Sequence, residues 1–224
     1  MIIALLGAES TGKSQLASEL AAHLSISGQR AIAVGEYLRE WCEREGRTPL
    51  PHEQAHIAHT QQSRIEVAAA QADWVIADTT PLMTAVYSEF IFADTSLHEA
   101  ALTYQRSFEL TLLTGLDMPW EADGIQRDGP HVRGPVDALI RSMLQSAGIA
   151  YEVVYGSGSQ RTTNALNAIS RLGKLPNTIN SIALCADSMP ANSQKNSKKW
   201  QWNCEKCSDP DCEHRLFSSL KLMH

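Results

Sequence analysis

The chain has 224 residues, 43% of them hydrophobic and 20% charged, which is typical of one globular domain with a full core and a short appendage. Its formal net charge is −6 and the sequence shows no basic patch, which disfavours a broad nucleic-acid-binding surface. No stretch approaches the ~20 apolar residues of a membrane span, so we expect a cytoplasmic chain without membrane partners and with reduced cysteines.

Short apolar runs alternate with helical patterns along the first 173 residues. The runs predict strands at 2–6, 31–34, 73–77, 109–114 and 151–155. Helices are predicted after residue 14, where Leu16, Leu20 and Leu24 repeat, over 53–71, and along the apolar stripe within 136–144. Strands that alternate with helices predict an α/β fold with a parallel sheet flanked by helices. Ligands of such sheets bind at the carboxyl ends of the strands.

The first strand leads into Gly7–Ser14, GAESTGKS, which matches the phosphate-binding pattern G-x-x-x-x-G-K-[ST]. Such a loop wraps phosphates with backbone N–H groups, and the following helix directs the positive end of its dipole at the anion. In this pattern Lys13 pairs with the β- and γ-phosphates and Ser14 ligates Mg²⁺. We therefore predict that a nucleoside triphosphate is bound by Gly7, Ala8, Glu9, Ser10, Thr11, Gly12, Lys13, Ser14 and Gln15.

Acidic residues follow two of the other predicted strands. Asp78 ends the run WVIAD, which matches the Walker B position that holds Mg²⁺ directly or through water. The alternative is that Asp78 caps the next turn. Glu36 follows the second strand and could accept the proton of a hydroxyl that attacks the γ-phosphate, while Tyr37 could stack on a flat ring. The alternative for Glu36 is an exposed position at the start of a surface helix.

Two further loops follow the fourth and fifth strands. The polar segment 117–133 could close over the nucleotide, with Arg127 and Arg133 meeting transition-state charge and Trp120 offering an aromatic platform. The alternative is a solvated loop with one packed tryptophan. The segment 156–161, GSGSQR, could contact the adenine, and we assign Arg161 to nucleotide binding. A flexible glycine turn is the alternative there.

The composition changes after residue 173. Residues 174–200 are rich in Asn, Ser and Lys and are predicted to be a linker, so we place the P-loop domain at 1–173 and a tail at 201–224. In the tail, Cys204, Cys207, Cys212 and His214 supply four ligands within eleven residues, which fits a tetrahedral structural Zn²⁺ site. An iron–sulfur cluster or no metal are the alternatives. Metal would supply the folding energy of so short a segment.

The motifs GAESTGKS, GEYLREW, VIADTTPLMTAVY and LDMPWEADGIQRDG together resemble the ribosylnicotinamide kinase domain of NadR-type proteins over roughly residues 1–172. The resemblance implies a P-loop kinase core with a five-stranded parallel sheet. It also implies transfer of the γ-phosphate of ATP, with Mg²⁺, to nicotinamide riboside, giving nicotinamide mononucleotide. Glu36, Tyr37, Trp120 and Asp123 would line the riboside site, and Asp78 would support Mg²⁺ or the ribose. Because the loop begins at residue 7, we do not expect the DNA-binding or adenylyltransferase functions of bifunctional members.

Two other functions remain open on the sequence. The acceptor could be another nucleoside, a vitamin or a phosphosugar, since the phosphate-binding residues would be the same. The chain could also be a regulatory ATPase whose zinc tail binds a partner, which predicts slow hydrolysis without a small acceptor. A GTPase is disfavoured because the sequence contains no N-K-x-D motif.

Overall fold

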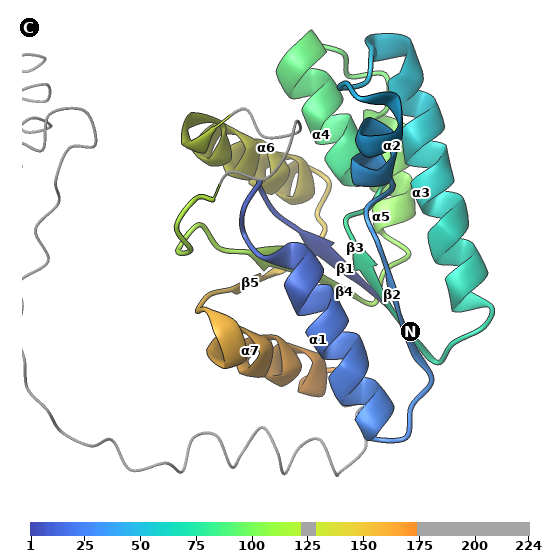
Figure 1. The fold of residues 1–224 in the computed structure, drawn as a ribbon, viewed down its shortest axis with the longest axis vertical. Coiled ribbons are helices and arrows are strands. Elements are labelled where there is room, and N and C mark those ends of the chain that lie inside the picture. The colour runs from blue at the N-terminus through green and yellow to red at the C-terminus, as the bar shows by residue number, and fades with distance from the viewer. Residues whose placement is uncertain (122–128, 174–224) are drawn as a thin grey trace, which may run out of the picture. The chain divides into compact units, whose positions relative to one another are not determined.

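A computed structural model describes residues 1–121 and 129–173 of the chain. These residues form a parallel sheet of five strands in the order β2-β3-β1-β4-β5 (Figure 1). The strands are β1 (Ile2–Leu6), β2 (Ala31–Val34), β3 (Trp74–Asp78), β4 (Leu110–Thr114) and β5 (Glu152–Val154). Each strand begins and ends within one residue of the predicted range, so the α/β expectation is confirmed.

Helices connect the strands, as the alternating pattern predicts. The helices are α1 (Lys13–Ile26), α2 (Tyr37–Glu45), α3 (Gln54–Ala69), α4 (Pro81–Phe92), α5 (His98–Gln105), α6 (Arg133–Ser146) and α7 (Gly158–Ser170). Short 3₁₀ turns, η1 (Pro51–Glu53) and η2 (Pro130–Val132), precede α3 and α6. The apolar stripes predicted at 16–24 and 136–144 form the buried faces of α1 and α6.

The sheet is covered on both faces (Figure 1). On one face Ile3 and Leu5 of β1 pack against Leu16 and Leu20 of α1, with α7 completing the layer. On the other face Leu6 packs with residues of α4 and α6, while Ala4 packs with α3. Alternate side chains of β1 therefore pack against opposite helical layers. All residues of the strand except Ile2 are buried, as expected of a central parallel strand.

The register brings the candidate residues to one edge of the sheet. Leu5 of β1 lies opposite Asp78 of β3, and Val34 of β2 lies opposite Ala77. The phosphate-binding loop, Asp78 and Glu36 therefore follow three neighbouring strands at their carboxyl ends, which is where such sheets bind ligands. The ends of β4 and β5 lie on the opposite side of β1.

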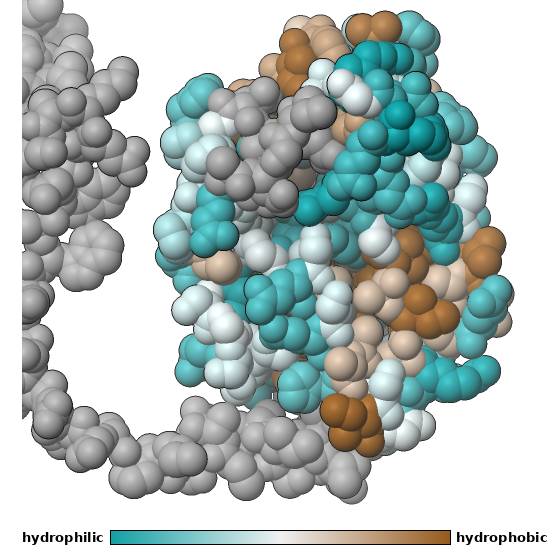
Figure 2. Space-filling view, in the orientation of Figure 1, coloured by the Kyte–Doolittle hydropathy of each residue, from teal (hydrophilic) through white to brown (hydrophobic). Residues whose placement is uncertain are grey.

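Figure 2 shows a face on which most residues are hydrophilic, while apolar residues gather on the side where β2 and the end of α3 lie in Figure 1. Exposed apolar side chains of the protein include Ile26 at the end of α1 and Val67 on α3. Single exposed apolar residues of this kind are ordinary on protein surfaces. None of the helices in residues 1–121 and 129–173 is long and apolar enough to cross a membrane.

Candidate nucleotide and acceptor site

The phosphate-binding loop connects β1 to α1 through backbone that favours glycine. Gly7 has a φ of +150°, and a Cβ at this position would lie 2.0 Å from Oγ1 of Thr114. Gly12 adopts the left-handed conformation (φ +71°) immediately before α1 begins at Lys13. Both glycines of the motif are thus required by close approach or by conformation, as the pattern predicts.

Hydrogen bonds hold the loop against the end of β4. Thr114 donates from Oγ1 to the carbonyl of Leu6 at 3.1 Å and lies 2.7 Å from Oγ1 of Thr11. Thr11 in turn donates to the carbonyl of Ala8 at 2.8 Å. Nζ of Lys13 donates to the same carbonyl at 2.8 Å, so its ammonium group lies over the loop. A phosphate placed in the loop would therefore meet a positive charge as well as backbone N–H groups.

Asp78 ends β3 as a buried carboxylate that is 4% exposed. Its Oδ1 has no hydrogen-bond partner among the residues that the structure describes. The next helix, α4, is capped by Thr80, whose Oγ1 accepts from the N–H of Leu82. A buried carboxylate oxygen without a donor is costly unless a cation or water approaches it, so the residue suits a Mg²⁺ site.

Glu36 is the N-cap residue of α2, but its side chain makes no capping hydrogen bond. The side chain is 14% exposed, and an oxygen lies 3.7 Å from Nη2 of Arg39. Glu36 is therefore largely enclosed, in contrast to the exposed surface glutamate of the alternative interpretation. A carboxylate at the end of β2 with a nearby guanidinium is able to accept a proton from a bound hydroxyl.

Tyr37 is 6% exposed and packs with Trp41, Cys42 and Ile57 of α2 and α3. The guanidinium carbon of Arg64 lies 4.5 Å from the centroid of the tyrosine ring. One face of the ring is thus already covered by a cation, which leaves less of it for a ligand than the sequence suggests.

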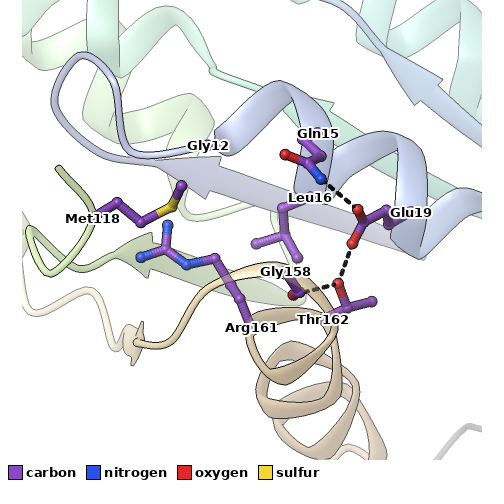
Figure 3. A pocket seen from close by; sticks show the side chains of 8 residues that line it. All are labelled: Gly12, Gln15, Leu16, Glu19, Met118, Gly158, Arg161 and Thr162. Atoms are coloured by element: carbon purple, nitrogen blue, oxygen red, sulfur yellow. Dashed lines mark hydrogen bonds between the residues drawn. The ribbon is translucent and has the colours of Figure 1, made fainter. Parts of the chain in front are cut away.

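A shallow pocket opens beside the phosphate-binding loop on the α7 side (Figure 3). Figure 3 shows that α1 contributes Gln15, Leu16 and Glu19, whereas α7 contributes Gly158, Arg161 and Thr162. Gly12 and Met118 complete the lining. Oε1 of Glu19 accepts from Gln15 at 2.8 Å, and its Oε2 accepts from the hydroxyl of Thr162. The pocket adjoins the phosphate-binding loop at Gly12.

Arg161, which we predicted to bind the nucleotide, is 3% exposed and makes hydrogen bonds to several loops. Its Nη2 lies 2.7 Å from Oδ1 of Asp117, its Nε donates to the carbonyl of Gly156 at 2.7 Å, and its Nη1 donates to the carbonyl of Thr11. The other oxygen of Asp117 accepts from the N–H of Gly156 at 2.5 Å. The guanidinium therefore fixes the phosphate loop to the ends of β4 and β5, in addition to lining the pocket.

Residues 2–161 match the model of a protein family described as AAA domain. The match covers more than half of the 224 residues. The chain belongs to the AAA domain family. No curated protein matches the sequence.

Solved structures show the same fold at low sequence identity. The structure of NadR protein in complex with NR gives a TM-score of 0.65 at 18% identity, over 78% of this chain and 52% of that chain. The AAA domain chain thus spans about half the length of that protein. Deoxyadenosine kinase from M. mycoides gives 0.55 with bound dATP (14% identity, 76% and 99% covered) and 0.51 with bound dCTP (11% identity, 76% and 100% covered). The AAA domain therefore has the fold of P-loop kinases.

The segment between β4 and α6 of the AAA domain is described in part. Trp120 is half-buried, and its Nε1 has no hydrogen-bond partner among residues 1–121 and 129–173. The N–H of Glu121 donates to Oγ of Ser10 at 2.7 Å, which connects this segment to the phosphate-binding loop. Arg133 is 8% exposed, and its Nη2 donates to the carbonyl of Leu116 at 3.5 Å, so it contacts the start of the same segment.

Six predicted residues lie outside the described ranges. These are Asp123, Arg127, Cys204, Cys207, Cys212 and His214. Within the described part of the AAA domain, no group of three or more His, Cys, Asp or Glu side chains could hold a metal ion. The zinc site in the tail stays a prediction.

Sequence reasoning missed several residues that shape this site. Thr114, at the end of β4, binds the phosphate loop, and Asp117, shortly after it, binds Arg161. Met118, Glu19 and Thr162 line the pocket. Their positions at or just after predicted strands, or one helical turn from a motif residue, were the available signal. Gln61 on α3 had no such signal, because it lies within the helix and far from every motif in the sequence.

Proposed function

We propose that the chain is an ATP-dependent kinase that phosphorylates nicotinamide riboside to nicotinamide mononucleotide, as in NAD salvage. The observation that carries the proposal is the buried Oδ1 of Asp78, which lacks a hydrogen-bond partner in the described residues and follows the strand beside the Lys13–Ser14 loop. The fold likeness to NadR protein in complex with NR supports the choice of acceptor. The motifs GEYLREW and DMPWEADG support it independently.

ATP would bind with its phosphates along the loop and its base in the pocket of Leu16, Met118 and Arg161. Lys13 would pair with the β- and γ-phosphates. Ser14 and Asp78 would hold Mg²⁺, which neutralises charge on the phosphates when it is bound. The backbone N–H groups are fixed in place before the ligand arrives, because Arg161 and Thr114 already hold the loop.

Glu36 would act on the acceptor. The 5′-hydroxyl oxygen attacks the γ-phosphorus, a new O–P bond forms, and the bond from that phosphorus to the β,γ-bridging oxygen breaks to leave ADP. The hydroxyl proton passes to the carboxylate of Glu36. Nη2 of Arg39 lies 3.7 Å from an oxygen of that carboxylate.

The acceptor ring would contact aromatic and acidic residues. Trp120 is half-buried and presents a donor at Nε1, whereas Tyr37 can offer only the part of its ring that Arg64 leaves uncovered. A cationic pyridinium ring suits such a site through attraction to an aromatic face and to nearby carboxylates. We propose that Asp123 belongs to this acceptor site, and that Arg127 and Arg133 stabilise charge on the transferred group.

An ATP-consumption assay with Mg²⁺ tests the proposal across nicotinamide riboside, deoxyadenosine, other nucleosides, thiamine and no acceptor. The expected result is ADP formation only with nicotinamide riboside, with nicotinamide mononucleotide identified by mass. Turnover with deoxyadenosine alone would identify deoxyadenosine as the acceptor in place of nicotinamide riboside. The fold likeness to deoxyadenosine kinase is the reason to include this nucleoside. Slow hydrolysis that is independent of every acceptor would instead indicate a regulatory ATPase.

Two substitutions separate binding from chemistry. Lys13→Ala should abolish transfer. Glu36→Gln should lower turnover by about 10²–10⁴-fold and leave ATP binding unchanged, because a general base contributes on that order. Glu40→Gln is the matched control, since Glu40 lies one turn further along α2, is 53% exposed and pairs with Arg64. Wild-type turnover by Glu36→Gln would exclude its role as base.

The tail proposal is tested separately. We propose that Cys204, Cys207, Cys212 and His214 bind one structural Zn²⁺. The purified chain should then contain one equivalent of zinc that Cys204→Ser with Cys207→Ser removes. Retention of zinc by that double variant would contradict the ligand assignment.

A further inference from the structure

Gln61 is a buried glutamine in the middle of α3, and no motif marks it. Its side chain is 2% exposed. Oε1 accepts from the backbone N–H of Tyr37 at 2.8 Å. Nε2 donates to the carbonyl of Gly35 at 3.2 Å and to the carbonyl of Thr79 at 3.4 Å.

The orientation of this amide is determined by its surroundings. Two carbonyl oxygens require the NH₂ group, and one N–H requires the carbonyl oxygen, so the opposite orientation would lose all three bonds. Both N–H donors of the glutamine are therefore used, each on a different loop. A single side chain thus joins the segment after β2 to the segment after β3.

The three bonded backbone groups flank the two proposed acidic residues. Gly35 and Tyr37 lie on either side of Glu36, and Thr79 directly follows Asp78. Thr79 has a φ of +70°, which is unfavourable for a β-branched residue. Its N–H is held by the carbonyl of Leu5 at 3.1 Å, and its own carbonyl is held by Gln61. Strained backbone of this kind persists only where the surrounding structure holds it.

We propose that Gln61 is a positioning residue that sets the proposed base, Glu36, relative to the proposed Mg²⁺ ligand, Asp78. Its bonds join the two loops directly, so each loop limits the movement of the other. The inference rests on the proposed kinase function for its catalytic consequence. A displacement of about 1 Å between a catalytic group and its substrate can cost about 10²-fold in rate. Loss of the amide should therefore lower turnover more than nucleotide binding.

Gln61→Leu removes all three hydrogen bonds at similar side-chain volume. We expect kcat to fall by about 10–100-fold while the KM for ATP changes less than about threefold, because the nucleotide is held by the loop after β1. The backbone N–H of Tyr37, freed from its partner, should exchange with deuterium faster than in the wild type. Gln61→Glu is a second variant if Gln61→Leu fails to fold. It keeps an acceptor for Tyr37, loses both donors, and should also lower kcat.

Gln105→Leu is the matched control, because Gln105 is 1% exposed and equally buried. Its amide bonds to the hydroxyl groups of Thr80 and Thr111 instead of the backbone beside Glu36. The control should lose thermal stability to a similar extent, with kcat within about threefold of wild type and normal exchange at Tyr37. Both rates are measured well below the unfolding midpoints.

Two results would overturn the inference. One is a folded Gln61→Leu or Gln61→Glu variant with wild-type kcat, and the other is an equal loss of kcat in Gln105→Leu. Failure of the proposed function is distinguishable, since the wild-type chain would then phosphorylate no acceptor. In that case unchanged exchange at Tyr37 in Gln61→Leu would still refute the link between the loops, and faster exchange would support it.

Discussion

Nη2 of Arg161 and Oδ1 of Asp117 lie 2.7 Å apart, in an ion pair whose arginine is 3% exposed and whose aspartate is 34% exposed. The pair connects α7 to the end of β4. Because the same guanidinium also donates to Thr11, the position of the phosphate-binding loop depends on a residue far along the chain. We therefore expect the pair to affect both stability and nucleotide binding.

Arg161→Met should lower the free energy of unfolding by about 3 kcal/mol, because it removes the donors to the carbonyls of Thr11 and Gly156 and the charged partner of Oδ1 of Asp117. ATP affinity should fall as well. Urea unfolding and nucleotide titration measure the two effects. Arg30→Met is the control, since Arg30 pairs with Asp73 at 2.9 Å on the surface and its loss should be barely detectable. Equal losses in both variants would contradict a special role for Arg161.

Asp78→Asn should raise the thermal midpoint of the ligand-free chain, because it removes a buried charge whose Oδ1 lacks a donor among the described residues. The same variant should lose the stabilisation that Mg²⁺ with ATP gives the wild type. Differential scanning calorimetry with and without Mg²⁺–ATP measures both changes. Asp137→Asn is the opposite case, because Asp137 is paired with Arg141 at 2.6 Å and its replacement should destabilise the chain. A destabilised Asp78→Asn would show that its carboxylate is satisfied within the protein.

Gly7→Ala should destabilise the chain by about 1–3 kcal/mol, because the new methyl group would lie 2.0 Å from the hydroxyl oxygen of Thr114 and the backbone has a φ of +150°. Thr114→Ala removes that oxygen. The double variant should therefore be more stable than the sum of the two single changes predicts. A double-mutant cycle by chemical denaturation measures this coupling. Strict additivity would show that backbone conformation alone excludes alanine at residue 7.

Stability should fall in acid partly through Glu53. Hydrogen bonds from Arg47 and from the N–H of Leu50 lower the pKa of Glu53 from 4.5 to about 2. Since the folded-state pKa is depressed, the contribution is complete above pH 4.5 and disappears as the pH falls through 2. Glu53→Gln should thus lose less stability than wild type between pH 6 and pH 3, as measured by urea unfolding at each pH. A parallel decline in the two proteins would remove Glu53 as a cause.

Much of the architecture was predictable because its signals are local. Each strand is a short apolar run. In the loop GAESTGKS, Gly7 and Gly12 stand at the two positions where close approach or a positive φ requires glycine. The placement of Asp78 and Glu36 at one edge of the sheet was predictable, because parallel strands bring their carboxyl ends to the same edge. For the strands and the phosphate-binding loop, the sequence within a few residues determined the outcome.

Other features depend on residues that are distant in sequence. The covering of Tyr37 by Arg64 reflects how α2 packs on α3, which no local pattern encodes. The structural bonds of Arg161 likewise depend on loops after β1, β4 and β5 that meet only in the folded sheet. From the sequence, Gln61 is predicted only to be a polar residue in a helix. The backbone groups that it joins are seen only in the fold.

The central position of β1 has a consequence for how such a protein could change its preferences. Strands β2 and β3, with Glu36 and Asp78, lie on one side of the phosphate loop, and β4 and β5, with the pocket of Met118 and Arg161, lie on the other. Exchange of residues 35–64 for the matching stretch of a relative would therefore replace Glu36, Tyr37 and Gln61 together and leave the residues that line the pocket unchanged.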